Sequence, residues 1–120
     1  MDGSKSWLAG GSDVAELSVS VTPRTDAVIV AAVGDVDISN AAELAEAIAS
    51  AVGEDKGAVV VDVADVGYCD TSGIRALVHG RRLADSHGVS YRVIGASGVV
   101  LDALRLTGVW PQLAGGGEPA

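Results

Sequence analysis

The chain has no phenylalanine, a single cysteine and few positive charges. Two tryptophans and two tyrosines are the only aromatic residues among 120, although 48% of the sequence is hydrophobic. Valine, alanine, leucine and isoleucine must therefore form the core, which suits helices packed on a β-sheet. With Cys69 alone, no internal disulfide can form, and nothing indicates an oxidising compartment.

The scarcity of cations also excludes some classes of ligand. The formal net charge is −8, whereas binding to nucleic acid requires clustered lysine and arginine. We therefore expect no direct contact with nucleic acid and a more basic protein as partner. One cysteine and two histidines do not give a recognisable metal-binding spacing, so we expect neither a metal nor a cofactor.

Long apolar segments are missing as well. The most apolar run, residues 27–33, is far shorter than the ~20 residues that a membrane helix needs. The first eleven residues lack the basic and apolar regions of a signal peptide. We expect a cytoplasmic protein that does not bind membranes.

Periodic patterns predict one α/β domain over residues 13–113, between a flexible segment at 1–12 and a flexible tail at 114–120. Residues 17–21 alternate as in a strand with one exposed face. The runs 27–33 and 58–61 indicate strands covered on both faces, and 90–94 indicates another strand. Helices are expected at about 41–52 and 72–86, with a third after Ser97. The predicted architecture is a mixed sheet of four to five strands with about three to four helices.

Helix ends can also be predicted from local residues. Asn40 and Glu43 have the spacing of a capping box, in which each side chain bonds the backbone N–H of the other residue. Ser97 could cap the third helix, and Gly108 is well placed to end it.

The most informative segment, residues 59–74, runs from a buried strand into the start of a helix. Thr71 and Ser72 place hydroxyls at a helix N-terminus, where unpaired N–H groups and the helix dipole favour a phosphate. Gly73 would leave room for a partner to approach. The alternative is that Thr71 or Ser72 only caps the helix.

Three segments of the chain together resemble a known family. Residues 68–74 read Tyr-Cys-Asp-Thr-Ser-Gly-Ile, residues 34–37 read Gly-Asp-Val-Asp, and residues 97–109 end in Leu-Thr-Gly-Val. In this order and at these distances they resemble the STAS domain of bacterial anti-sigma factor antagonists. The resemblance covers roughly residues 14–113 and implies a STAS-like fold.

The resemblance also implies a function without catalysis, in which Thr71 is phosphorylated by a partner. In the family, the unphosphorylated antagonist binds an ATP-binding anti-sigma factor kinase and thereby frees the sigma factor. Phosphorylation breaks that complex, and a phosphatase resets it. The chain is then expected to be a monomer or weak dimer when free. Thr71 stands where the family more often has serine, and the expected partner-binding residues are Asp35, Asp37, Asp70, Ser72, Gly73 and Ile74.

Other functions are less compatible with the sequence. A receiver-like phospho-signalling domain would use Asp62 at a strand end with Asp35 and Asp37, but it needs a later lysine, and none follows Lys56. A hydrolase using Ser72 would need a nearby base, and both histidines lie turns away on the predicted helix. Residues 95–98 lack a nucleotide-binding pattern and are explained by a turn and a cap. A STAS subunit of a larger signalling assembly remains an alternative.

Overall fold

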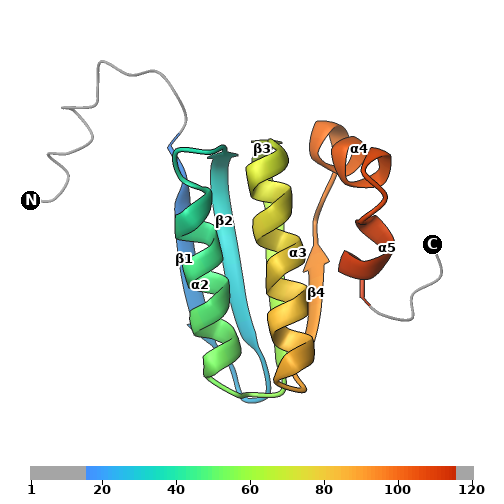
Figure 1. Cartoon of the computed structure of the whole chain (residues 1–120). Coiled ribbons are helices and arrows are strands. Elements are labelled where there is room, and N and C mark those ends of the chain that lie inside the picture. The colour runs from blue at the N-terminus through green and yellow to red at the C-terminus, as the bar shows by residue number, and fades with distance from the viewer. Residues whose placement is uncertain (1–15, 116–120) are drawn as a thin grey trace, which may run out of the picture.

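The computed structural model describes residues 16–115, which contain four strands and four helices (Figure 1). The predicted flexible segment at 1–12 and residues 116–120 of the predicted tail lie outside the described residues. In chain order the elements are β1 (Ser18–Pro23), β2 (Val28–Val36), α2 (Ala41–Gly53), β3 (Ala58–Cys69), α3 (Thr71–Ser86), β4 (Ser90–Ile94), α4 (Gly98–Leu106) and α5 (Trp110–Leu113).

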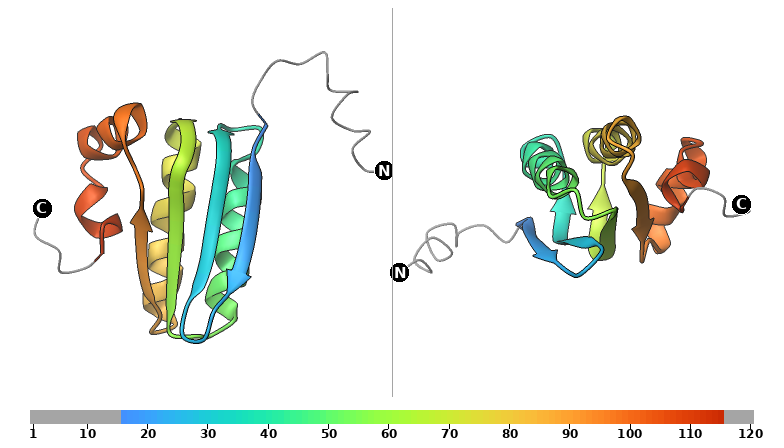
Figure 2. Two further views of the ribbon diagram at one scale, coloured as in Figure 1. Left: turned by 180° about the vertical axis from the view of Figure 1, so that it is seen from behind. Right: turned by 90° about the horizontal axis from the view of Figure 1, so that it is seen from below.

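The strands form one sheet in the order β1-β2-β3-β4, so β1 and β4 are its edges. β1 runs antiparallel to β2, whereas β2, β3 and β4 are mutually parallel. α2 and α3 lie side by side on one face of the sheet, and α4 and α5 lie beyond β4 (Figure 2). The predicted α/β fold with a mixed sheet is confirmed, with four strands.

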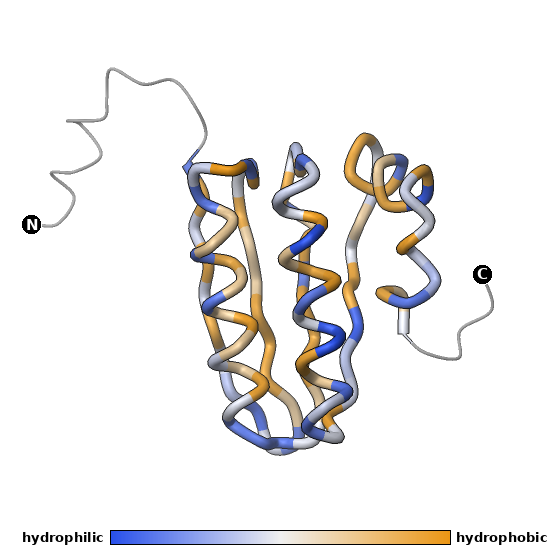
Figure 3. The backbone as a smooth tube through the Cα atoms, in the orientation of Figure 1, coloured by the Kyte–Doolittle hydropathy of each residue, from blue (hydrophilic) through white to orange (hydrophobic). Residues whose placement is uncertain are grey.

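The core lies between the sheet and the α2–α3 layer. Alternate residues of β2 and β3, such as Val28, Val30, Val59 and Val61, are at most 1% exposed. Both strands are largely apolar along their length, which suits their place in the core (Figure 3). No charged side chain is buried within residues 16–115, and valine, leucine, isoleucine and alanine make up most of the core, as predicted.

The prediction that β2 and the start of β3 are covered on both faces is wrong for the part of the chain that the structure describes. Both helices that pack on the sheet lie on the same side of it (Figure 2). On the other side, Ile29, Ala31 and Val60 are only half-buried, and Val33 is 48% exposed. An uninterrupted β-branched run does not by itself reveal whether the second face is covered.

The helix boundaries agree with the predicted ones, but the predicted N-terminal caps do not form. Asn40 makes no side-chain cap bond to α2, because its amide is used in the preceding turn. Ser97 precedes α4 without a side-chain cap bond. Gly108 adopts a φ of 77° just after α4, as expected of a residue that ends a helix.

Two features were not predicted. β3 continues to Cys69, well beyond the predicted end at residue 61, and the short helix α5 follows α4. The first residues of the predicted tail pack on the fold: the Ala114 N–H donates to the Trp110 carbonyl at 2.8 Å, and Gly115 lies beside Arg92. None of the helices within residues 16–115 is long and apolar enough to cross a membrane.

Candidate functional site

The ends of β2 and β3 bring the two acidic motifs together. Val36 pairs with Cys69 in the parallel ladder, and the Asp70 N–H donates to the Val36 carbonyl at 3.1 Å. Asp37 and Asp70 therefore directly follow paired residues, at the end of the sheet where β2 and β3 finish. α3 begins at the same end, with Thr71 as its first residue (Figure 1). Parallel strands place their carboxyl ends together, which explains the convergence.

Asp70 is the N-cap of α3. Its Oδ1 accepts hydrogen bonds from the Ser72 hydroxyl at 2.5 Å, the Ser72 N–H at 2.9 Å and the Gly73 N–H at 3.2 Å. The Ser72 hydroxyl, followed by the backbone N–H groups of Gly73, Ser72 and Ile38, lowers the pKa of the Asp70 carboxyl, although desolvation opposes them. Asp70 is therefore a carboxylate at neutral pH.

This cap corrects two sequence-based interpretations. Neither Thr71 nor Ser72 caps α3, so capping does not account for Thr71. Three of the N–H groups at the helix N-terminus that were expected to favour a phosphate are also engaged within the protein. Asp70 takes the N–H groups of Ser72 and Gly73, and the Ile74 N–H donates to the Asp70 carbonyl at 3.0 Å.

The two neighbouring hydroxyls differ in their surroundings. Ser72 is half-buried and its hydroxyl is held by Asp70. Thr71 is exposed, and its hydroxyl has no hydrogen-bond partner among residues 16–115. Of the two, Thr71 is thus the one that an external enzyme can reach without first breaking a bond.

Asp37 lies in a tight turn between β2 and α2. Its Oδ1 accepts from the Ser39 N–H at 2.9 Å and from the Ser39 hydroxyl at 2.5 Å. The Asp37 N–H donates to Asn40 Oδ1 at 2.9 Å, and Asn40 Nδ2 donates to the Asp35 carbonyl at 3.0 Å. The side chain of Ile38, at the tip of this turn, is 84% exposed. The turn thus holds an acidic side chain and an exposed apolar one beside Asp70.

Asp35 is placed differently from Asp37. β2 ends at Val36, so Asp35 and Asp37 are not alternate residues of one strand. Asp35 pairs with Tyr68 in the ladder, and both alternate with the buried Val36 and Cys69. They therefore lie on the sheet face opposite α2 and α3. The structure brings Asp37, Asp70 and Thr71 together, but it does not bring Asp35 to the same surface.

Gly73 and Ile74, which were expected to bind a partner, lie in the interior of the fold. A Cβ on Gly73 would lie 2.5 Å from Cys69 Sγ and 2.8 Å from Val36 Cγ1. Gly73 thus allows α3 to approach the sheet, rather than a partner to approach α3. Ile74 is 8% exposed and is part of the core.

Sequence reasoning missed two apolar features near Thr71. The first is Ile38, which the charges around it concealed. The second is a shallow groove of about 360 Å³ between α2 and α3, lined by Ala41, Ala42, Ala45, Ser72, Arg75, Ala76 and His79. The small side chains are visible in the sequence, but the sequence does not show that they line a groove between two helices.

Other candidate chemistries find little support in the geometry. Asp62 lies within β3 rather than at a strand end, and its Oδ1 accepts from the Ala64 N–H at 2.9 Å. Burial, with a smaller contribution from Asp70, raises the pKa of the Cys69 thiol to about 11, so Cys69 is protonated and unreactive at neutral pH. His79 and His87 are exposed, as predicted. Residues 16–115 contain no group of three metal-binding side chains.

Comparison with known proteins agrees with this geometry. The family model described as "Mlab, STAS domain" matches residues 9–110. The chain belongs to the STAS domain family. The resemblance inferred from its three motifs is thereby confirmed at the level of the family.

Solved structures share the fold of this STAS domain. An anti-sigma factor antagonist from Mycobacterium paratuberculosis is 20% identical, with 78% of this chain and 80% of that chain covered and a TM-score of 0.71. The phosphorylated form of the Bacillus cell fate determinant SpoIIAA is 14% identical, with 78% and 87% covered and a TM-score of 0.60. An antagonist STAS domain from Rhodobacter sphaeroides is 20% identical, with 66% and 86% covered and a TM-score of 0.55. No curated protein matches the sequence.

Proposed function

We propose that this STAS domain is an anti-sigma factor antagonist whose binding to an anti-sigma factor kinase is switched off by phosphorylation of Thr71. It would act by binding rather than by catalysis, in the cytoplasm, with a phosphatase to reset it. The general role is supported by the family and by the antagonists that share its fold. The observation that carries the assignment to Thr71 is its exposed hydroxyl, which is free beside a capped helix start.

The partner surface would surround Thr71 and use the groups that face outward there. Ile38 offers an exposed apolar side chain, and the groove between α2 and α3 begins at Ser72. Arg75 and His79 line that groove, so a partner with apolar and acidic side chains fits it. Gly73 and Ile74 would contribute only by shaping α3 from within.

Phosphorylation would act through charge. A phosphate adds about −1.5 to −2 charges. It would stand next to the Asp70 carboxylate, which is ionised at neutral pH and already accepts from the N–H groups of Ser72 and Gly73. Like charges brought together at an interface cost several kcal/mol. A penalty of about 3 kcal/mol would weaken binding on the order of a hundredfold.

The test is to incubate the protein with candidate anti-sigma factor kinases and ATP, and to locate phosphate by mass spectrometry. We expect modification of Thr71 in the wild type and in Ser72→Ala, and none in Thr71→Val, which keeps the shape but not the hydroxyl. Phosphate on Ser72, or a Thr71→Val protein modified as fast as the wild type, would contradict the assignment.

The second candidate is a STAS subunit of a larger assembly. It is favoured by the description of the matching family model, which names Mlab rather than an antagonist. Such a subunit would hold its partner through the same surface without a phosphate switch. A stable complex that persists with ATP and leaves Thr71 unmodified would support this function and refute the switch.

A further inference from the structure

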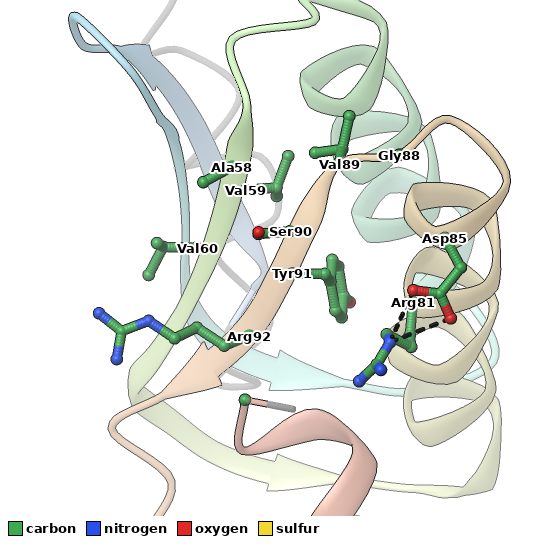
Figure 4. A pocket seen from close by; sticks show the side chains of 11 residues that line it. Ala58, Val59, Val60, Arg81, Asp85, Gly88, Val89, Ser90, Tyr91 and Arg92 are labelled. Carbon is green, nitrogen blue, oxygen red and sulfur yellow. Dashed lines mark hydrogen bonds and ion pairs between the residues drawn. The ribbon is translucent and has the colours of Figure 1, made fainter. Parts of the chain in front are cut away.

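A second hollow of this STAS domain lies away from Thr71, at the edge of β4 that pairs with no strand within residues 16–115. It has a volume of about 530 Å³ and lies between the first half of β4, the end of α3 and Gly115 (Figure 4). Helix α3 begins at Thr71 and ends at Ser86, and its 16 residues span about 24 Å. The end of α3 that lines this hollow is therefore the one opposite to Thr71.

The hollow extends over both faces of β4. Figure 4 shows Val60 and Arg92 on one side of the strand, and Tyr91 and Arg81 on the other. A strand laid beside an edge strand directs alternate side chains to the two faces of the sheet. A strand added here would thus meet lining side chains on both faces of β4.

The backbone of β4 is oriented to bond such a strand. The Ser90 N–H donates to the Gly57 carbonyl of the neighbouring chain segment at 3.0 Å, and β4 pairs with β3 residue by residue. Because successive residues turn their backbone groups to opposite sides, Tyr91 directs its N–H and carbonyl away from β3, toward the free edge. Such groups are a template for strand addition.

The charges at this edge select the occupant. The only ion pair within residues 16–115 joins Arg81 and Asp85, at 3.0 Å, so Arg92 has no carboxylate partner there. A second copy is disfavoured, because antiparallel pairing through Tyr91 would bring the two Arg92 side chains to the same face as direct or diagonal neighbours. An acidic segment has no such conflict.

We propose that the free edge of β4 is a docking site for an extended acidic segment of a partner protein, which adds to the sheet as a fifth strand. The segment would bond the backbone of Tyr91 and place a carboxylate beside Arg92. This proposal does not depend on the Thr71 switch.

The experiment delivers a probe strand in cis. A Gly/Ser linker of about ten residues, with a reach of roughly 17 Å, is appended to the full chain. It carries either the acidic segment TVEVEVT or the basic segment TVKVKVT. Tethering raises the effective concentration of each segment to the millimolar range. Backbone amide hydrogen exchange is then followed by NMR, with the Arg92 N–H, which faces β3, as internal reference.

We expect the acidic segment to slow exchange of the Tyr91 N–H at least tenfold, while the basic segment leaves it unchanged. Arg92→Glu should reverse the preference. Equal protection by both segments, or by neither, would overturn the proposal. Slow exchange in the unmodified chain, with no further change on tethering, would also overturn it. That result would mean that another part of the chain, or a second copy if it depends on concentration, already occupies the edge.

Discussion

Adding a side chain at Gly73 should destabilise the fold rather than weaken partner binding directly. In Gly73→Ala the new Cβ would lie 2.5 Å from Cys69 Sγ and 2.8 Å from Val36 Cγ1, closer than real Cβ atoms come to other atoms. Both neighbours are buried, at 7% and 1% exposure, so neither can move freely.

The expected loss follows from two opposing effects. Overpacking a filled core costs about 1–3 kcal/mol, and replacing glycine by alanine within a helix gains about 1 kcal/mol. Gly73→Ala should therefore lower the free energy of unfolding by about 1 kcal/mol, or roughly 4–8 °C in melting temperature. Gly73→Val adds two further methyl groups and should lose about 3 kcal/mol or more.

Urea unfolding of three variants would measure this effect. Gly53→Ala is the matched control, since Gly53 is also helical and a Cβ there meets nothing within 4 Å. We expect Gly53→Ala to be at least as stable as the wild type. Removing the clashing sulfur in Gly73→Ala/Cys69→Ala should recover part of the loss, with a coupling of about 0.5–3 kcal/mol.

The reasoning would be refuted if Gly73→Ala were as stable as Gly53→Ala. It would also be refuted if the folded fraction of Gly73→Ala bound the partner much more weakly than the wild type. That second result would restore the sequence-based idea that Gly73 exists for the approach of a partner.

Three further outcomes follow from the site. Thr71→Glu should weaken partner binding at least about tenfold in calorimetry, because its carboxylate stands beside Asp70, while the neutral Thr71→Gln should bind nearly normally; equal weakening by both would indicate a steric effect. Asp37→Ala should lose about 1–3 kcal/mol in thermal unfolding, because two hydrogen bonds of the turn are removed, and should also be phosphorylated more slowly; Asp37→Asn keeps the acceptor oxygen, and its phosphorylation at the wild-type rate would place Asp37 in the scaffold only. Because the fold lowers the pKa of Asp70 below 3.8, its charge stabilises the protein above that pH, and this contribution is lost as the pH falls through the lowered value. The stability difference between wild type and Asp70→Asn in urea should therefore be present at neutral pH and shrink as the pH falls below 3.8, and a constant difference would contradict the role of the charge.

Much of the fold was predictable because it is encoded in short-range patterns. The alternation in β1, the apolar runs of β2 and β3 and the periodicity of α2 and α3 each depend on residues within a few positions of one another. These patterns do not show which face of the sheet is covered. The covered face depends on the side of the sheet on which α2 and α3 connect the parallel strands. Both lie on the same side, so the prediction of two covered faces was wrong.

The candidate site was predictable only in its location. Residues 68–74 and 34–37 predicted that Thr71 and acidic residues lie close together, and parallel strands do bring Asp37 and Asp70 to one end of the sheet. The roles within the site were less accurate. A sequence does not show whether a residue at a helix start is exposed, caps the helix or packs against the sheet. Those roles differ in which atoms the residue contacts.

The sequence by itself thus determined the α/β class, the STAS family and the region around Thr71, since each depends on local order along the chain. Only the tertiary structure decided that Asp70 caps α3, that Gly73 and Ile74 face inward and that Thr71 keeps a free hydroxyl. It also decided that β4 pairs with no strand other than β3 within residues 16–115. The physical reason is that hydrogen-bond partners, burial and edge exposure are relations between segments distant in sequence, and only the packed chain brings those segments together.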